Sequence, residues 1–401
     1  MKQASNNAGI VRLARIAVAC AAFATLVACG GGSDNNNNNA SSAPAGGVKL
    51  QVVSFGDSLS DAGTYSPVIA ANFGGGRFTT NPGEVWTQKV AEYYGDTLTP
   101  AYVGGFGQPL KANGGFGYAQ GGSDVANPVG IGFAPNNMAA TTVPVKSQVT
   151  QYLTDHGSFN SNQLVLINGG ANDILQLLQN TQFMTNLQTQ LATATTVQQQ
   201  QLIIGTAVGT QLQTTIQSFV GLVGTTLSNG ATHVVVVDVP DIGLTPLATG
   251  EAAANNAPQL PALITGIVSA YNALVANGLK TAGIDTKVIQ VSSFIWLHQL
   301  LGSYQSQGFT NATGTGCNIT QMEQNATAYA TANPSVLVGG MTAQQYGQQF
   351  GSSLFCSPQT LTVAGADQSY VFADQLHPTT HAYAAFATYV EQQIAATGLG
   401  K

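Results

Sequence analysis

Short runs of consecutive apolar residues alternate along this chain with longer stretches in which apolar residues recur at helical spacing. The short runs predict buried strands at Leu50–Phe55, Leu164–Ile167, His233–Val237 and Lys287–Val291. The longer stretches predict helices at Trp86–Tyr94, Val197–Leu227, Ala262–Leu279 and His381–Ala396. Apolar strands separated by helices are typical of a parallel sheet that is covered on both faces. We therefore predict an α/β fold with three layers, in which helices cover both faces of a central parallel sheet.

Two regions carry a weaker pattern. Gly74–Gly122 is rich in glycine, which predicts loops with positive backbone φ angles rather than regular elements. Leu300–Phe355 is long and polar, with a weak helical pattern only around Met341–Gln349. We interpret this second region as a surface insertion near residues 300–355, within a single domain that covers residues 48–401.

The N-terminus carries the pattern of an export signal. Arg12 and Arg15 precede the apolar run Ile16–Ala28, which is too short to span a bilayer comfortably. This arrangement predicts a signal peptide over residues 1–28. The sequence Leu-Val-Ala-Cys that ends at Cys29 resembles a bacterial lipobox, in which the cysteine is lipidated and becomes the mature N-terminus. The alternative is an ordinary signal peptide, with Cys29 incidental.

The segment after Cys29 has almost no apolar side chain to bury. Residues 29–47 consist mainly of glycine, asparagine, serine and alanine, which predicts a flexible tether. We therefore expect an exported protein, either an outer-membrane lipoprotein or a secreted one. In the first case the protein would contact the membrane only through its N-terminal lipid anchor.

Composition narrows the range of partners. Charged residues make up 7% of the chain, and its 11 Lys+Arg leave no basic stripe that could follow a phosphate backbone. We therefore expect no nucleic-acid partner. The hydrophobic content of 44% is enough for a sizeable core.

Two cysteines remain once Cys20 in the signal peptide and Cys29 are set aside, namely Cys317 and Cys356. An isolated pair in an exported protein predicts a disulfide. The alternative is two unpaired buried thiols.

The first predicted strand ends in Phe-Gly-Asp-Ser-Leu-Ser, which presents Ser58 on a sharp turn. A strand, a turn and a helix start together can expose a hydroxyl at the top of a sheet, so Ser58 is a candidate nucleophile. A free hydroxyl is a weak nucleophile at neutral pH and needs a base. The neighbouring Asp57 is interpreted as a structural residue that holds the turn.

The best candidate for that base is His377, which lies in an Asp-x-x-His sequence with Asp374. A short turn of this kind lets the carboxylate accept from the imidazole Nδ1–H and leaves Nε2 facing the serine. The alternative for this sequence alone is a solvated turn ahead of a helix.

Acyl transfer also needs donors where negative charge develops. The backbone N–H of Ser58 is one candidate. Gly122 is a second, because its N–H can approach a ligand without hindrance from a Cβ atom. Asn172 directly follows a predicted strand and its glycines, so its amide could reach the carboxyl edge of the sheet, where ligands bind in open α/β sheets. The alternatives are a tight turn at Gly122 and a helix cap at Asn172.

The order Gly-Asp-Ser-Leu-Ser, Gly, Gly-x-Asn-Asp and Asp-x-x-His resembles the GDSL, or SGNH, family of esterases and lipases, in particular its lipase-like branch. The resemblance runs from about residue 48 to the C-terminal helix. It implies an SGNH-hydrolase-like fold and a serine esterase or lipase with no metal and no organic cofactor. Its substrates would be acyl esters or lipids.

By this resemblance Ser58 is the nucleophile, His377 is the general base and then the acid, and Asp374 orients His377. The N–H of Ser58, Gly122 and Asn172 form the oxyanion hole. The family often has asparagine where this chain has Gly117, so Gly121 remains an alternative to Gly122. The walls of the acyl pocket are expected to come from residues 74–117 and from the insertion.

The sequence is also compatible in part with three other functions. A phospholipase or a lipid acyltransferase could use the same triad. Asp374, His377 and His381 have a spacing that could hold a metal, but the proline after His377 disfavours the continuous helix this would need. A non-catalytic surface lipoprotein suits the tether and the low charge, but it does not explain the ordered set of catalytic residue types.

Overall fold

The computed structural model describes residues 43–401 except 106–107, 132–141, 335–336, 338–339 and 350. The predicted signal peptide, Cys29 and most of the predicted tether lie outside the described residues.

The centre of the fold is a four-stranded parallel sheet in the order β1-β4-β5-β6. Its strands are β1 (Gln51–Phe55), β4 (Gln163–Ile167), β5 (His233–Val237) and β6 (Ile289–Val291). All four predicted strands are therefore present, and the predicted α/β fold with a central parallel sheet is confirmed. Because the strands are parallel, their carboxyl ends meet at one edge, and the segments that follow β1, β4 and β5 lie close together there.

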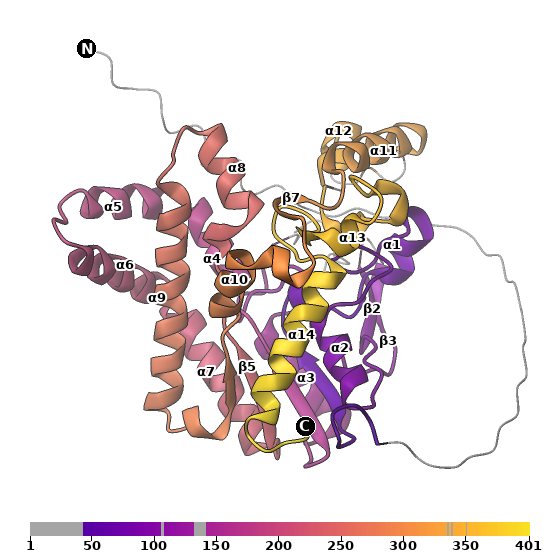
Figure 1. Ribbon diagram of the computed structural model, residues 1–401, viewed down its shortest axis with the longest axis vertical. Helices are drawn as coiled ribbons and strands as arrows, with labels where there is room; N and C mark the ends of the chain where they lie inside the picture. Colours follow the sequence, from indigo (N-terminus) through magenta and orange to yellow (C-terminus); the bar gives the residue numbers. More distant parts are fainter. Residues whose placement is uncertain (1–42, 106–107, 132–141, 335–336, 338–339, 350) are drawn as a thin grey trace, which may run out of the picture.

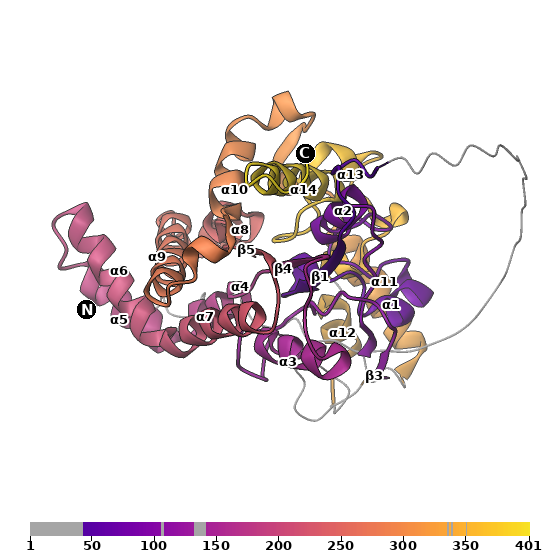
Figure 2. The same ribbon diagram turned by 90° about the horizontal axis from the view of Figure 1, so that it is seen from below.

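Alternate side chains of the strands point to opposite faces of this sheet and enter two separate apolar clusters. Val53, Val165 and Val234 lie in one cluster, and Val52 and Val235 lie in the other. The first face is covered by α3 (Val145–His156), α4 (Ala171–Gln179), α7 (Gln213–Ser228) and α9 (Leu260–Thr281). The second is covered by α2 (Trp86–Tyr93), α10 (Ser293–Gly302) and α14 (Thr380–Ala395). Figure 2 shows α2, α10 and α14 on one side of the strands and α3 and α7 on the other.

The long helical stretch predicted at Val197–Leu227 is two helices, α6 (Val197–Gln211) and α7, which meet at Leu212. With α5 (Thr181–Leu191), α6 projects away from the sheet (Figure 1, left). Among the described helices only α9 is long and apolar enough to cross a membrane. Its residues Ile264, Ile267 and Val268 are buried in the first apolar cluster, as expected for a core helix of a folded domain.

Smaller elements surround the sheet. β2 (Tyr102–Gly105) and β3 (Gln108–Ala112) form an antiparallel pair, and β7 (Asn311–Thr315) pairs in parallel with β8 (Tyr370–Phe372). The other helices are α1 (Ser66–Phe73), α8 (Pro246–Ala254), α11 (Ile319–Ala332), α12 (Ala343–Gln349) and α13 (Ala366–Ser369). The weak helical pattern around Met341–Gln349 corresponds to α12, whereas α11 was not predicted.

The region interpreted as an insertion has an apolar cluster of its own. Met322 and Ala326 of α11 and Tyr346 of α12 are buried in it, together with Ile69 of α1. A disulfide joins Cys317 to Cys356 within this cluster, so the predicted pairing is confirmed.

Candidate active site

Ser58 lies on the turn between β1 and a short 3₁₀ helix, Ser58–Ser60. The Asp57 carboxylate accepts from the backbone N–H of Leu59 at 3.0 Å and from the side-chain amide of Asn168 at 2.9 Å. Glycine is required at residue 56, since a Cβ atom there would lie 1.9 Å from Oδ1 of Asn168. Asp57 therefore caps the 3₁₀ helix and ties the turn to the end of β4, which fixes the direction of the Ser58 side chain.

The structure brings Ser58, His377 and Asp374 into one hydrogen-bonded chain, although 319 residues separate the first two. Nε2 of His377 lies 2.9 Å from Oγ of Ser58. Nδ1 of His377 lies 2.8 Å from Oδ2 of Asp374 and 3.1 Å from Oδ1. The three residues are 8%, 8% and 3% exposed, respectively, so water competes little with these contacts.

The surroundings of Asp374 favour its charged form. Burial by itself would raise the pKa of this carboxyl group. The adjacent His377, the hydrogen bonds that it donates and a hydrogen bond from the Ser353 N–H outweigh burial and lower the pKa well below its ordinary value. An ionised Asp374 keeps the proton of His377 on Nδ1, which leaves Nε2 to accept from the Ser58 hydroxyl.

Backbone groups hold the turn that carries Asp374. Its Oδ1 accepts from the N–H groups of Leu376 and His377 at 2.8 and 2.7 Å, and its Oδ2 accepts from the Ser353 N–H at 2.6 Å. The His377 ring packs on Phe78, with ring centroids 5.1 Å apart. Ser353 and Phe78 were not predicted from the sequence. The Ser353 contact uses a backbone donor, which leaves no signal in the sequence.

The two glycines that remained as alternatives differ in their N–H groups. The Gly121 N–H donates to Oδ2 of Asp61 at 2.9 Å and is therefore already engaged. No hydrogen-bond partner for the Gly122 N–H, or for that of Ser58, occurs among the residues that the structure describes. Gly122 has φ +85°, and a Cβ atom there would lie 2.0 Å from the Ile131 carbonyl oxygen, so the backbone requires glycine.

Asn172 lies in the first turn of α4 and is buried. Its side-chain amide donates one hydrogen bond to the Ser123 carbonyl at 2.7 Å. This contact ties the amide to the turn that contains Gly122. The amide has a second N–H available, because each asparagine side chain has two donors.

Two buried acids lie next to these residues in the sequence, Asp173 directly after Asn172 and Asp124 two residues after Gly122. Asp173 accepts from the Val125 N–H and from the Thr215 hydroxyl, both at 2.9 Å. Burial, reinforced by the nearby Asp173, raises the pKa of Asp124 to about 8. Asp124 therefore retains its proton at neutral pH in the folded protein.

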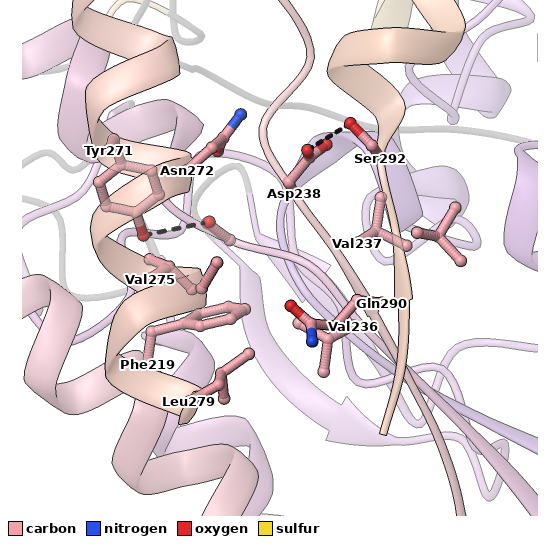
Figure 3. Close-up of a pocket in the computed structure, with 13 residues that line it drawn as sticks. Phe219, Val236, Val237, Asp238, Tyr271, Asn272, Val275, Leu279, Gln290 and Ser292 are labelled. Carbon is pink, nitrogen blue, oxygen red and sulfur yellow. Dashed lines mark hydrogen bonds between the residues drawn. The ribbon is translucent and has the colours of Figure 1, made fainter. Parts of the chain in front are cut away.

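A pocket lined mainly by apolar side chains opens beside Ser58 and Asn172 and extends over the second face of the sheet. Another pocket lies over the first face, between α9 and the strands β5 and β6 (Figure 3). There Tyr271 donates to the Gly169 carbonyl at 3.4 Å and Ser292 donates to Asp238 at 2.6 Å. This second pocket touches neither Ser58 nor Asn172.

The three residues weighed as metal ligands do not converge. Nε2 of His377 contacts Ser58 and Nδ1 of His377 contacts Asp374, whereas Nδ1 of His381 bonds to the Gln368 carbonyl and the His381 ring stacks on Phe309. Within the part of the chain that the structure describes, no group of three or more His, Cys, Asp and Glu side chains could hold a metal ion.

The fold and the site together define an α/β protein in which a serine, a histidine and an aspartate form a hydrogen-bonded chain at the carboxyl edge of a parallel sheet. The chain belongs to the GDSL-like lipase/acylhydrolase family, whose family model matches residues 52–390. Members of this family are generally ester hydrolases. A search of curated proteins found no match to this chain.

Proposed function

We propose that this protein is a serine esterase or lipase that hydrolyses carboxylic esters through an acyl-enzyme on Ser58. The observation that carries the proposal is the continuous hydrogen-bonded chain from Asp374 through His377 to Ser58. Nucleophile and base are within hydrogen-bond reach, and a third group orients the base, which is the arrangement that nucleophilic catalysis by a hydroxyl requires.

In the first half of the reaction Oγ of Ser58 attacks the ester carbonyl while Nε2 of His377 takes the hydroxyl proton. The negative charge that develops on the carbonyl oxygen is met by the N–H groups of Ser58 and Gly122 and by the side-chain amide of Asn172. The bond to the alcohol then breaks, and His377 gives its proton to the departing oxygen. Ser58 is left acylated, and Asp374 stabilises the positive charge that His377 carries in between.

In the second half His377 takes a proton from water, and the resulting hydroxide attacks the acyl carbonyl. The same donors stabilise the second tetrahedral intermediate. Its collapse releases the carboxylic acid and returns the proton to Oγ of Ser58. No metal or organic cofactor takes part in either half.

Replacement of single residues tests this assignment with chromogenic 4-nitrophenyl esters. We expect Ser58→Ala and His377→Ala each to lower kcat by about four orders of magnitude or more. His381→Ala is the matched control, because this histidine lies four residues further on and bonds to the Gln368 carbonyl instead. Equal turnover by wild type and Ser58→Ala would refute the proposal.

We also propose that the protein is exported and lipidated at Cys29. The signal-like N-terminus supports this, and so does the disulfide, since such bridges persist mainly in oxidising compartments. In a bacterial host fed labelled palmitate, wild type is expected to incorporate the label and Cys29→Ala to lose it. Labelling of the variant at the wild-type level would refute lipidation at this residue.

A further inference from the structure

We propose that the pocket beside Ser58 binds the acyl chain of the ester and that Leu297 is one of the residues that set the chain length. This inference rests on the proposed function and adds the substrate class, namely esters of apolar carboxylic acids longer than acetate. Of the two segments expected from the sequence to form the walls of the acyl pocket, residues 74–117 contribute Trp86, whereas no residue of 300–355 lines this pocket among the residues that the structure describes.

The pocket lies directly beside the proposed reacting group. Ser58 and Asn172 line one part of it, so it begins at the atom that would be acylated and at one of the candidate oxyanion donors. The pocket in Figure 3 lies over the other face of the sheet and touches neither residue. The two pockets share only the lining residues Gly169, Val237 and Asp238, which lie where β4 and β5 end.

The walls of the pocket are mainly apolar. From Ser58 the pocket extends between the sheet and the helices α2, α10 and α14, where Trp86, Trp296, Leu297 and Phe386 line it. These side chains are buried and belong to the apolar cluster on the second face of the sheet. Transfer of an alkyl chain from water to such a wall is favourable in proportion to the apolar area that is covered.

Three of the aromatic side chains that line the pocket also pack on one another. The ring of Phe386 lies 5.3 Å from that of Trp86 and 4.7 Å from that of Trp296, measured between centroids. These packed rings form a stiff boundary, which limits the length of chain that fits. A bounded pocket suits the acyl part, which stays bonded to Ser58 after the alcohol has left.

Leu297 offers a direct test, because it is 4% exposed and lines this pocket from α10. Leu297→Trp would fill the pocket, and Leu297→Ala would enlarge it. Leu300→Ala is the matched control: Leu300 lies one turn further along α10, is equally buried in the same cluster, and does not line the pocket. A general loss of core packing would affect both alanine variants, whereas a change in chain-length preference is expected only at Leu297.

The experiment measures kcat/KM for 4-nitrophenyl acetate, butyrate, octanoate, laurate and palmitate with the intact mature protein. For Leu297→Trp we expect the ratio of octanoate to acetate to fall about tenfold or more, since even one methylene is worth at least that in a tight apolar pocket. For Leu297→Ala we expect the optimum to move to a longer chain. The Leu300→Ala profile should match that of wild type.

An unchanged chain-length profile in Leu297→Ala would overturn the inference, as would an equal change in Leu300→Ala. If Leu297→Trp does not fold, the two alanine variants still decide. A wild-type enzyme that hydrolyses none of these esters would instead contradict the proposed function. Hydrolysis with an unaltered profile in the Leu297 variants would contradict only the assignment of the pocket.

Discussion

Asp374 shows how much of the site depends on one carboxylate. Three backbone N–H groups donate to it in addition to the His377 ring. Oxygen atoms that accept this many hydrogen bonds are fixed in orientation and favoured in the ionised state. The position of the imidazole, and through it the direction of Nε2 toward Ser58, follows from this one buried group.

Asp374→Asn is expected to lower kcat by about three to four orders of magnitude, because the amide cannot stabilise the imidazolium and disturbs the tautomer of His377. The amide would also place an NH₂ group against backbone donors, which costs about 1–3 kcal/mol of stability. Kinetics and urea denaturation measure the two effects. Asp367→Asn, at a partly exposed aspartate of α13, is the control. A kcat within tenfold of wild type would contradict the role of Asp374.

Asp124 leads to a prediction about pH and stability. Its pKa is raised to about 8 in the folded protein from an ordinary value of 3.8. Between these values the unfolded chain loses the proton and the folded protein keeps it. The stabilising contribution is therefore complete below about pH 4 and is lost as the pH rises to about 8.

Asp124→Asn removes this titration. The free energy of unfolding of wild type should fall relative to that of the variant as the pH rises from 5 to 8. Urea denaturation of both proteins at each pH measures this difference. A difference between the two proteins that stays constant over this range would show that Asp124 titrates normally.

At the residue scale the sequence predicted those features that lie in short motifs. The candidates Ser58, Asp374 and His377 could be found because a nucleophile turn and an Asp-x-x-His turn are local patterns. The contacts of Asp61 with the Gly121 N–H and of Ser353 with Asp374 could not be found. They join segments distant in sequence through backbone donors, which every residue type except proline has.

At the scale of elements, the turn at Gly122 positions a candidate oxyanion donor. Asp61 engages the neighbouring Gly121 N–H, and the Asn172 amide bonds to the Ser123 carbonyl. The turn is thus held on both sides of Gly122. A shift of this segment would move the Gly122 N–H away from the carbonyl oxygen of a bound ester.

Gly122→Ala is expected to lower kcat by about two to three orders of magnitude, the usual loss for one oxyanion donor, because the new Cβ atom would force the turn away from Ile131. Gly157→Ala is the matched control. Gly157 also has a positive φ, of +81°, but nothing lies within 4 Å of the added Cβ atom. This control should lose about 1 kcal/mol of stability through backbone strain and keep its activity. Similar kcat values for both variants would exclude Gly122 as a donor.

Among the helices that were not predicted from the sequence, α11 has a weak apolar pattern. The strands were found because β4 and β5 are continuous runs of leucine, valine and isoleucine. In α11 the buried positions are Met322, Ala326 and Ala330, and alanine gives little contrast with the glutamine, asparagine and threonine around it. The break at Leu212 between α6 and α7 also has no proline or glycine at the junction to mark it.

At the scale of the whole molecule, the disulfide joins two segments that meet at the Asp374 turn. The Cys317 N–H donates to the Ala373 carbonyl at 2.8 Å, one residue before Asp374. Cys356 lies three residues after Ser353, whose N–H donates to Asp374 itself. The bridge thus connects the polar region after α10 to the acid of the proposed triad.

The double variant Cys317→Ala/Cys356→Ala is therefore expected to lose both stability and turnover. Opening a loop with a sequence separation of 39 residues should lower the free energy of unfolding by about 3–4 kcal/mol in the chain-entropy model. Because the Ser353 contact with Asp374 then loosens, kcat should fall more than KM changes. Urea denaturation and ester kinetics, each with and without reductant, measure this. Reductant should lower the free energy of unfolding and the kcat of wild type to the values of the variant, and it should leave the variant unchanged. A wild type that keeps its stability and kcat after complete reduction would show that the disulfide supports neither.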